Sequence, residues 1–354
     1  MDSTQALLKE LTEAYGPPGH EDEIAALMKK HLRGLGEVTQ DRLGSVICKQ
    51  KGSADEPRIM FAGHMDEVGF MVKSITKDGF IKFLPMGGWW GHVLLAQKVR
   101  IRTRKGDVLG VVGSKPPHEL KDEERRKVLD LSDMFIDVGA TSTFDVKKKL
   151  GIRAGDPIVP EAGFHVMANE RLYLAKALDN RMGCAMVVDT LRRLAKTPHP
   201  NTAYGVATTM EEVGLRGATT SVAAVKPHVA IAVDVGIAHD TPGTQGEGDE
   251  KLGGGVGILA YDASMVPNVR LRNLAIDTCE RLKIPYHLGT VERGGTDAGR
   301  FHIYDTGVPS LVLFTATRYI HSHSTIMDRK DYDAAVRLLV EMTKRLDKKT
   351  VAGL

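Results

Sequence analysis

The sequence predicts an α/β fold, with a mixed central sheet covered by helices on both faces and an inserted small β-rich domain. Two observations lead to this prediction. Apolar strand-like runs alternate with amphipathic helical patterns in the first and last parts of the chain, as in sheets that carry helices on both faces. From Lys73 to about Gly163, strand–turn–strand patterns replace this alternation. We therefore expect an α/β domain from residues 1–72 and 164–354, and an insertion from residues 73–163.

The first part of the chain has the pattern of two helices followed by two strands. A Gly-Pro-Pro-Gly break at Gly16 to Gly19 separates the helices within residues 3–35. The second helix has acids in its first turn and basic residues later, as the helix dipole favours. Strands are expected over residues 45–50 and 58–62. The latter run is almost wholly apolar, which is typical of a buried central strand.

The insertion has the pattern of successive hairpins. Strands are expected over residues 70–75, 80–84, 98–103 and 108–112, joined by glycine-containing turns. A charged stretch from Lys115 to Arg126 follows. It fits a solvated face, and a contact between subunits is the alternative interpretation.

The alternation of helices and strands returns after the insertion. Helices are expected over residues 182–194, 219–224, 268–282 and 331–348, and strands over residues 203–208, 229–233, 286–289 and 310–315. Ligands of such sheets gather beyond the carboxyl ends of the strands. Polar residues that follow these strands are therefore candidates for one common site.

The amino-acid composition argues against several classes of protein. The formal net charge of +3 is small for 354 residues and gives no reason to expect a nucleic-acid or membrane partner. No apolar run approaches the roughly 20 residues that span a bilayer, and the N-terminus lacks the pattern of a signal peptide. The three cysteines, Cys48, Cys184 and Cys279, form no CxxC pair. Reduced thiols in the cytoplasm are the simplest account.

Two adjacent acids, Glu211 and Glu212, follow an apolar strand and precede a glycine-containing turn. Such a pair is costly to place together unless a cation lies beside it. Other His and Asp residues stand near the ends of strand-like segments, and zinc, cobalt and manganese accept these ligand types without thiolates. Two metals about 3.5–4 Å apart need a bridging carboxylate, for which we favour Asp179. The expected ligands of two divalent ions are His64, Asp179, Glu212, Asp234 and either His321 or His323.

Two acids near these ligands have other expected roles. Asp66 follows His64 by two residues, so both side chains point the same way if the segment is extended; Asp66 could then accept the second ring N–H of His64. Glu211 diverges from Glu212 and remains free to act as general base. It would take a proton from a metal-bridging water and give it to the leaving amine.

Each candidate also has an ordinary interpretation. His64 could be a hydrogen-bonded polar residue, Asp179 a helix N-cap and Asp234 a turn residue. Asp297, in a Gly-Gly-Thr-Asp turn, is a candidate for supporting the site or touching the substrate.

Five motifs occur in order along the chain: Gly63-His64-Met65-Asp66-Glu67-Val68-Gly69, Ala177-Leu178-Asp179-Asn180-Arg181, Glu211-Glu212-Val213-Gly214-Leu215-Arg216-Gly217-Ala218, Gly294-Gly295-Thr296-Asp297-Ala298-Gly299 and Arg318-Tyr319-Ile320-His321-Ser322. Together they resemble the dinuclear metallo-aminopeptidases that assemble as tetrahedral (TET) particles. Members of that family are labelled glutamyl aminopeptidase, deblocking aminopeptidase or endoglucanase. The resemblance extends into the insertion, at residues 115–118 and 135–140.

The resemblance implies a zinc-exopeptidase-like fold and a Zn²⁺- or Co²⁺-dependent aminopeptidase that removes N-terminal residues from small peptides. It implies Glu211 as the base, and it selects His321 over His323, where family members usually have proline. It implies metal ligands at His64, Asp179, Glu212, Asp234 and His321. It also implies that the insertion mediates dimerisation and that dimers build a tetrahedral homododecamer.

Two other functions fit this residue pattern less well. An endo-acting glucan hydrolase of the cellulase type needs two carboxylates about 5–9.5 Å apart across the sugar bond and has no use for two ligand-spaced histidines. A metal-held scaffold without catalysis has a closed site and needs no free base such as Glu211. The sequence leaves open the preferred N-terminal residue and the choice among zinc, cobalt and manganese.

Overall fold

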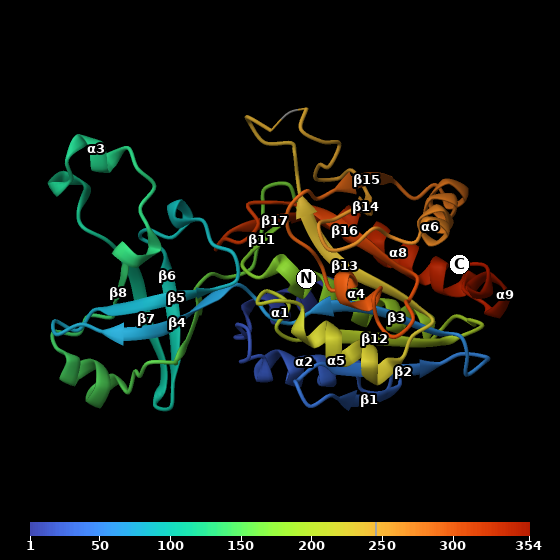
Figure 1. The fold of residues 1–354 in the computed structure, drawn as a ribbon, viewed down its shortest axis with the longest axis horizontal. Coiled ribbons are helices and arrows are strands. Elements are labelled where there is room, and N and C mark those ends of the chain that lie inside the picture. Colours follow the sequence, from blue (N-terminus) through green and yellow to red (C-terminus); the bar gives the residue numbers. More distant parts are fainter. Residues whose placement is uncertain (245) are drawn as a thin grey trace.

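The computed structural model describes residues 1–244 and 246–354, with the side chain of Glu124 also outside the description. It has a large α/β body and a smaller closed barrel beside it (Figure 1). The predicted α/β class, with its mixed sheet, helices on both faces and a β-rich insertion, is confirmed. No helix of the described part of the chain is both long enough and apolar enough to cross a bilayer.

The body is built on one 11-stranded sheet. Four parallel strands occupy its centre: β12 (Thr202–Thr208), β3 (Arg58–His64), β13 (Val229–Ile237) and β16 (Ser310–Arg318). The other strands flank this centre and are β1 (Glu37–Gln40), β2 (Val46–Lys51), β10 (His165–Val166), β11 (Leu172–Ala175), β14 (Val256–Tyr261), β15 (Tyr286–Thr290) and β17 (Thr325–Asp328). The main path runs β1-β2-β12-β3-β13-β16-β17-β11-β10, with β14 joining β15 to β16.

Helices cover both faces of this sheet, as seen in Figure 1. The larger core cluster lies under α1 (Ser3–Glu13), α2 (Asp22–Leu32), α4 (Leu178–Leu194), α6 (Val269–Leu282) and α8 (Arg329–Arg345). The smaller cluster lies under α5 (Arg216–Val225) and α7 (Ala298–Phe301). The helix predicted to run to residue 348 instead ends at Arg345. Asp347 then caps a separate short helix, α9 (Lys348–Ala352), by accepting the Thr350 N–H at 2.7 Å.

A close approach between α4 and β3 sets the position of the site. A Cβ atom on Gly63 would lie only 2.6 Å from the carbonyl carbon of Gly183. Glycine at position 63 therefore allows the helix to pack directly on the strand. This packing brings the beginning of α4, with Asp179, next to His64 at the end of β3.

The insertion forms a closed barrel with the strand order β4-β5-β8-β7-β6-β9. Its strands are β4 (Gly69–Ile75), β5 (Ile81–Met86), β6 (Lys98–Thr103), β7 (Gly106–Gly113), β8 (Phe135–Asp137) and β9 (Pro157–Pro160). Between them lie short helical segments at Gly91–Val93, Pro117–Glu119, α3 (Asp122–Arg125), Leu131–Asp133 and Asp145–Leu150. In the charged stretch from Lys115 to Arg126, the described side chains are exposed except for half-buried Leu120.

Candidate metal centre

The proposed ligands come from distant parts of the chain and meet at the carboxyl ends of the central parallel strands. His64 ends β3, Glu212 follows β12, and Asp234 lies within β13. His321 stands on the loop after β16, with a positive φ of 54°. Asp179 completes the group from the start of α4, where its own backbone is not helical. The structure thus brings together all five residues that the sequence singled out as ligands.

Asp179 lies between the two histidines. Its Oδ1 is 3.0 Å from Nε2 of His64, and its Oδ2 is 3.1 Å from Nε2 of His321. Each histidine also faces one further acid: Asp234 Oδ1 is 3.9 Å from His64 Nε2, and Glu212 Oε1 is 3.3 Å from His321 Nε2. One carboxylate is therefore shared between two groups of donors.

These two groups have the composition of metal sites. His64, Asp179 and Asp234 offer donor atoms within 4.8 Å of one another, and so do Asp179, Glu212 and His321. Imidazole and carboxylate together suit Zn²⁺ and similar divalent cations. Among the described residues, no Lys or Arg forms an ion pair with these carboxylates. The donor set therefore fits two cations that share Asp179.

Burial makes the acids of this group unfavourable as anions. It raises the pKa of Glu211 well above its usual range, and the neighbouring Asp234 carboxylate raises it further. Burial also raises the pKa of Asp234 and of Glu212, with repulsion from Asp179 adding to both. Asp179 is the exception: hydrogen bonds with His321 and His64 outweigh its burial and lower its pKa. A cation placed among the acids would relieve this repulsion.

Glu211 lies close to the donors but belongs to neither three-residue group. It is 9% exposed, and its Oε2 is 3.8 Å from Nε2 of His64. The loop that carries it is held through three consecutive backbone N–H groups. Met210 donates to Glu21 Oε1, Glu211 to Asp66 Oδ1 and Glu212 to Asp66 Oδ2, each at 3.0 Å. Two acids from elsewhere in the chain thus fix the backbone from which Glu211 and Glu212 project.

Asp66 lies beside the His64 ring, and its backbone oxygen is the nearer acceptor. The ring Nδ1 of His64 lies 3.0 Å from the backbone oxygen of Asp66, closer than the 3.5 Å to its carboxylate. The strand β3 ends at His64. The Asp66 carboxylate instead turns to the Glu211–Glu212 backbone.

The two other candidates, His323 and Asp297, lie at different places. The Nε2 atom of His323 is 2.9 Å from the backbone oxygen of Lys98 in β6, so His323 contacts the barrel. Asp297 accepts a hydrogen bond from the Thr208 hydroxyl at 2.5 Å and is 2% exposed. Burial raises the pKa of Asp297 to about 6. Asp297 therefore borders the acids without belonging to either group of donors.

A second buried group of charges was not anticipated from the sequence. Lys176 Nζ lies 2.6 Å from Glu67 Oε1, and both side chains are 1% exposed. The fully buried Arg181 is 3.5 Å from the same carboxylate. Its other donors reach backbone oxygens of Leu11 at 2.7 Å, Gly16 at 3.0 Å and Met65. The available signal was the charge pattern within the motifs themselves, since Glu67 and Arg181 stand close to His64 and Asp179.

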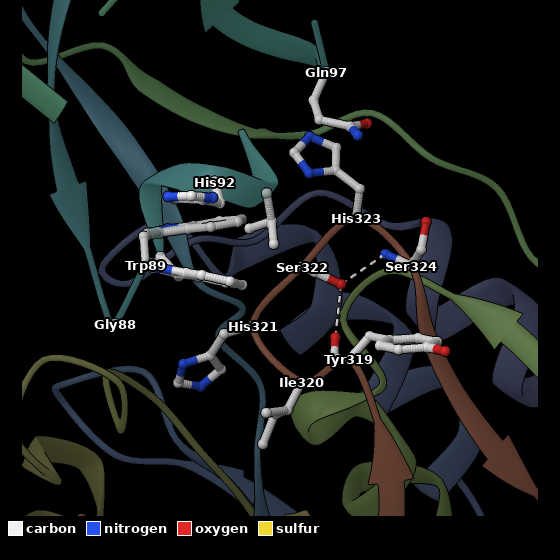
Figure 2. A pocket seen from close by; sticks show the side chains of 12 residues that line it. Gly88, Trp89, His92, Gln97, Tyr319, Ile320, His321, Ser322, His323 and Ser324 are labelled. Carbon is white, nitrogen blue, oxygen red and sulfur yellow. Dashed lines mark hydrogen bonds between the residues drawn. The ribbon is translucent and has the colours of Figure 1, made fainter. Parts of the chain in front are cut away.

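An open hollow of about 710 Å³ adjoins His321. Figure 2 shows the His321 ring at its edge, near Trp89, and the His323 ring turned toward Gln97. Trp90, which is 62% exposed, stacks on His92 with ring centroids 4.6 Å apart. The hollow lies between the barrel and the loop after β16 and is lined largely by aromatic and small polar side chains.

Comparison with known proteins places this geometry in a family context. The model of the M42 glutamyl aminopeptidase family matches residues 44–338, and a model described as AMPT matches residues 2–28. Three similar relatives are a putative aminopeptidase, FrvX, of Escherichia coli (39% identity; 94% of this chain, 93% of the relative), a glutamyl aminopeptidase of Lactococcus lactis (36%; 98% and 97%) and a lysyl aminopeptidase of Pyrococcus furiosus (35%; 96% and 98%).

Solved structures are similar to this chain over nearly its whole length. A TET aminopeptidase from the marine sediment archaeon Thaumarchaeota archaeon SCGC AB-539-E09 superposes with a TM-score of 0.97 at 46% identity, covering 100% of this chain and 99% of that one. The TET1 peptidase of Pyrococcus horikoshii, described as assembling into a tetrahedron or a large octahedral shell, has a TM-score of 0.86 at 29% identity (97% and 100%). A Thermotoga maritima protein described as an endoglucanase also matches, with a TM-score of 0.76 at 27% identity (98% and 98%).

Proposed function

This chain belongs to the M42 glutamyl aminopeptidase family and is an aminopeptidase, and we propose that it removes N-terminal residues from small peptides with two divalent cations bound at the acid–histidine cluster. We define this cluster as His64, Asp179, Glu211, Glu212, Asp234 and His321. The proposed ligands are its members other than Glu211. Zn²⁺ and Co²⁺ suit these donors, and Mn²⁺ is also accepted by such ligands.

One observation carries this proposal. The two oxygens of Asp179 face the Nε2 atoms of two different histidines, at 3.0 Å and 3.1 Å. A single hydrogen-bonded histidine would explain one of these contacts but not both. Shared use of one carboxylate by two groups of donors is the arrangement that a dinuclear hydrolase needs.

The proposed roles of the chain's own residues follow from their positions. Two bound cations would supply Lewis acidity to the scissile carbonyl and make hydroxide available near neutral pH. Glu211 accepts the proton of the attacking water and passes it to the nitrogen of the leaving amine as the C–N bond breaks. Asp66 holds the backbone N–H groups of Glu211 and Glu212 and thereby positions the base.

The cellular setting and the assembly are proposals on other grounds. Three buried cysteines without disulfides suit the reducing cytoplasm. The structural relatives described as TET assemblies favour a tetrahedral homododecamer built from dimers. We propose the barrel as the dimerisation domain, because it stands beside the body and leaves the charged stretch from Lys115 to Arg126 exposed.

The test uses one preparation stripped with a chelator and another reloaded with Zn²⁺, Co²⁺ or Mn²⁺. Aminoacyl-nitroanilides and short peptides are assayed beside a soluble glucan. We expect release of N-terminal residues only after metal is restored, and no glucan cleavage. Cleavage of the glucan without aminopeptidase activity would support the endo-acting glucan hydrolase and overturn the proposal.

A further inference from the structure

A second pocket lies on the Asp234 side of the cluster. It has a volume of about 440 Å³ and is lined by residues of β13, β14, β15 and β16 and of the loops that follow β13 and β15. Asp234 pairs with Phe314 in the parallel register of β13 and β16, so both side chains lie on the same face of the sheet. Thr296, which precedes Asp297, lines another wall. Val235 also lines the pocket, so the residue that follows the proposed ligand Asp234 contributes to its wall.

The floor of this pocket is the ring of Phe314. The ring packs against three glycines from three strands. A Cβ atom on Gly236, Gly257 or Gly289 would lie 2.3–2.4 Å from its atoms, so glycine leaves room for the ring at each position. Leu259 and Val312 continue the apolar surface. The pocket thus offers a flat apolar wall to a side chain that enters it.

Carboxylates are placed against this apolar floor. Glu250 is only 7% exposed, and its Oε2 is 3.1 Å from Nδ1 of His239. Its Oε1 lies 2.8 Å from the position that a Cβ of Gly289 would occupy, a position itself 2.4 Å from the Phe314 ring. Glu247 and Glu292 also line the pocket, whereas Arg293 is the single Lys or Arg among its described lining residues. The described lining therefore carries three carboxylates, one guanidinium and the His239 imidazole that contacts Glu250.

This combination suits one kind of side chain. Lysine and arginine lay their methylene stems along apolar surfaces and keep a charged end group for a polar partner. The Phe314 floor fits the stem, and the buried Glu250 carboxylate fits the cationic end, through a charge-assisted hydrogen bond. An acidic side chain would instead meet carboxylates of its own sign.

The hollow beside His321 differs from this pocket in its volume and in the charge of its lining. It is larger, at about 710 Å³, and no acidic residue lines it among those described. A leaving peptide continues beyond the scissile bond and needs the larger space. The N-terminal residue has no chain before it, so a smaller pocket is sufficient for its side chain.

We propose that the pocket at Phe314 and Glu250 binds the side chain of the N-terminal residue and selects a basic residue, lysine or arginine. This inference rests on the proposed aminopeptidase function of the neighbouring cluster. Within the family, relatives are described as glutamyl and as lysyl aminopeptidases, so the preference of each chain depends on its own pocket.

The test compares kcat/KM for lysyl-, arginyl-, glutamyl- and leucyl-nitroanilide with the metal-loaded protein. We expect the lysyl and arginyl substrates to exceed the glutamyl substrate by at least about tenfold, a ratio that corresponds to about 1.4 kcal/mol. Glu250→Gln should lower kcat/KM for the basic substrates by about tenfold and leave the leucyl substrate within about twofold. Asp249→Asn is the matched control: Asp249 is exposed, precedes Glu250 and does not line the pocket, so no change is expected.

Other outcomes would overturn the inference. A preference for the glutamyl substrate that disappears in Arg293→Gln would assign the pocket to acidic residues. Equal loss of all four substrates in Glu250→Gln, with thermal unfolding unchanged, would show that the carboxylate does not select charge. If Glu250→Gln fails to fold, Glu292→Gln takes its place with the same expected direction. If the metal-loaded protein cleaves no substrate, the proposed function itself fails; cleavage of leucyl-nitroanilide without a charge preference contradicts only the present inference.

Discussion

Two buried groups of charged residues lie close together, and their carboxylates have different kinds of partners. In the Glu67 cluster, which we define as Glu67, Lys176 and Arg181, the carboxylate meets an ammonium at 2.6 Å and a guanidinium at 3.5 Å. The remaining donors of Arg181 reach backbone oxygens, as at Leu11 and Gly16. In the acid–histidine cluster, four carboxylates face two imidazoles and one another.

The difference in pairing indicates that one cluster has a structural role and the other a functional one. The chain satisfies the Glu67 cluster with its own groups, so that cluster can stiffen the segments that carry His64 and Asp179. The acid–histidine cluster has no Lys or Arg partner within the described residues, and burial opposes ionisation of most of its acids. Within the described chain, its positive charge comes from protons on the two imidazoles, because the neighbouring carboxylates outweigh burial and raise the pKa of His64 and of His321. Bound cations would take the place of these protons. The predictions below test this contrast, in order of expected size.

The largest expected effect is on the Glu67 cluster. Glu67→Gln removes the only carboxylate that faces Lys176 and Arg181 in the cluster, and leaving buried charges unpaired costs about 3–5 kcal/mol of unfolding free energy. Denaturant unfolding of the metal-stripped protein measures this loss. Glu341→Gln is the control, because its partner Lys344 is 36% exposed, and pairs of that kind contribute about 0–1 kcal/mol. Similar small losses in both variants would contradict the structural role.

The next effect is on catalysis. Glu211→Gln keeps the size of the side chain but removes the base, so kcat should fall at least about 10²-fold, equivalent to about 2.7 kcal/mol. Elemental analysis should find both metals still bound, since Glu211 belongs to neither three-residue group of donors. Activity near that of the parent protein would show that another group takes the proton.

A smaller effect is expected at Glu21, which holds the loop of Glu211 from outside the cluster. Glu21→Ala removes the acceptor of the Met210 N–H, a hydrogen bond worth about 1 kcal/mol, and kcat should fall roughly fivefold. Glu21→Gln retains an acceptor oxygen and should stay within about twofold. If Glu21→Ala lowers only the unfolding temperature and leaves kcat and KM unchanged, Glu21 does not position the base.

The smallest expected effect is also on the unfolding free energy, but its sign is opposite to that of Glu67→Gln. Asp234→Asn removes one of the mutually repelling carboxylates, so the metal-stripped protein should keep its unfolding free energy or gain up to about 1 kcal/mol. The same variant should bind metal more weakly than the parent protein. A loss of several kcal/mol in the metal-stripped state would mean that Asp234 is satisfied within the chain, as Glu67 is.

The central strands and the helices of the body were predictable because their patterns are local. Residues 98–103 were predicted as a strand, and β6 has these bounds; the run at 58–62 corresponds to β3, which extends to His64. Short strands such as β9 and β17 were not predicted, because four residues carry little periodicity. Closure of the barrel was also not predicted. The strand β9, bounded by Pro157 and Pro160, closes it by pairing with both β4 and β6. That pairing depends on contacts far apart in the sequence.

At the site, residue type and position near the ends of strands and helices indicated most of the side chains that meet, and the family resemblance was needed to select His321 over His323. They were not enough to assign every hydrogen bond. Asp66 was expected on the His64 ring, and its carboxylate lies 3.5 Å from that ring, but its hydrogen bonds to the backbone of Glu211 and Glu212 were not expected. Glu21 was interpreted only as an acid in the first turn of a helix, yet it reaches Met210. Both contacts depend on how loops turn, which side-chain spacing does not determine.

The central claim is that the acid–histidine cluster requires two cations from outside the chain. Its most direct test is calorimetric titration of chelator-stripped protein with Zn²⁺ or Co²⁺, with aminopeptidase activity measured at each addition. We predict saturation at two ions per chain, with activity reaching its maximum as the second ion binds. Full activity in the presence of chelator, or saturation without any bound metal at this cluster, would contradict the account.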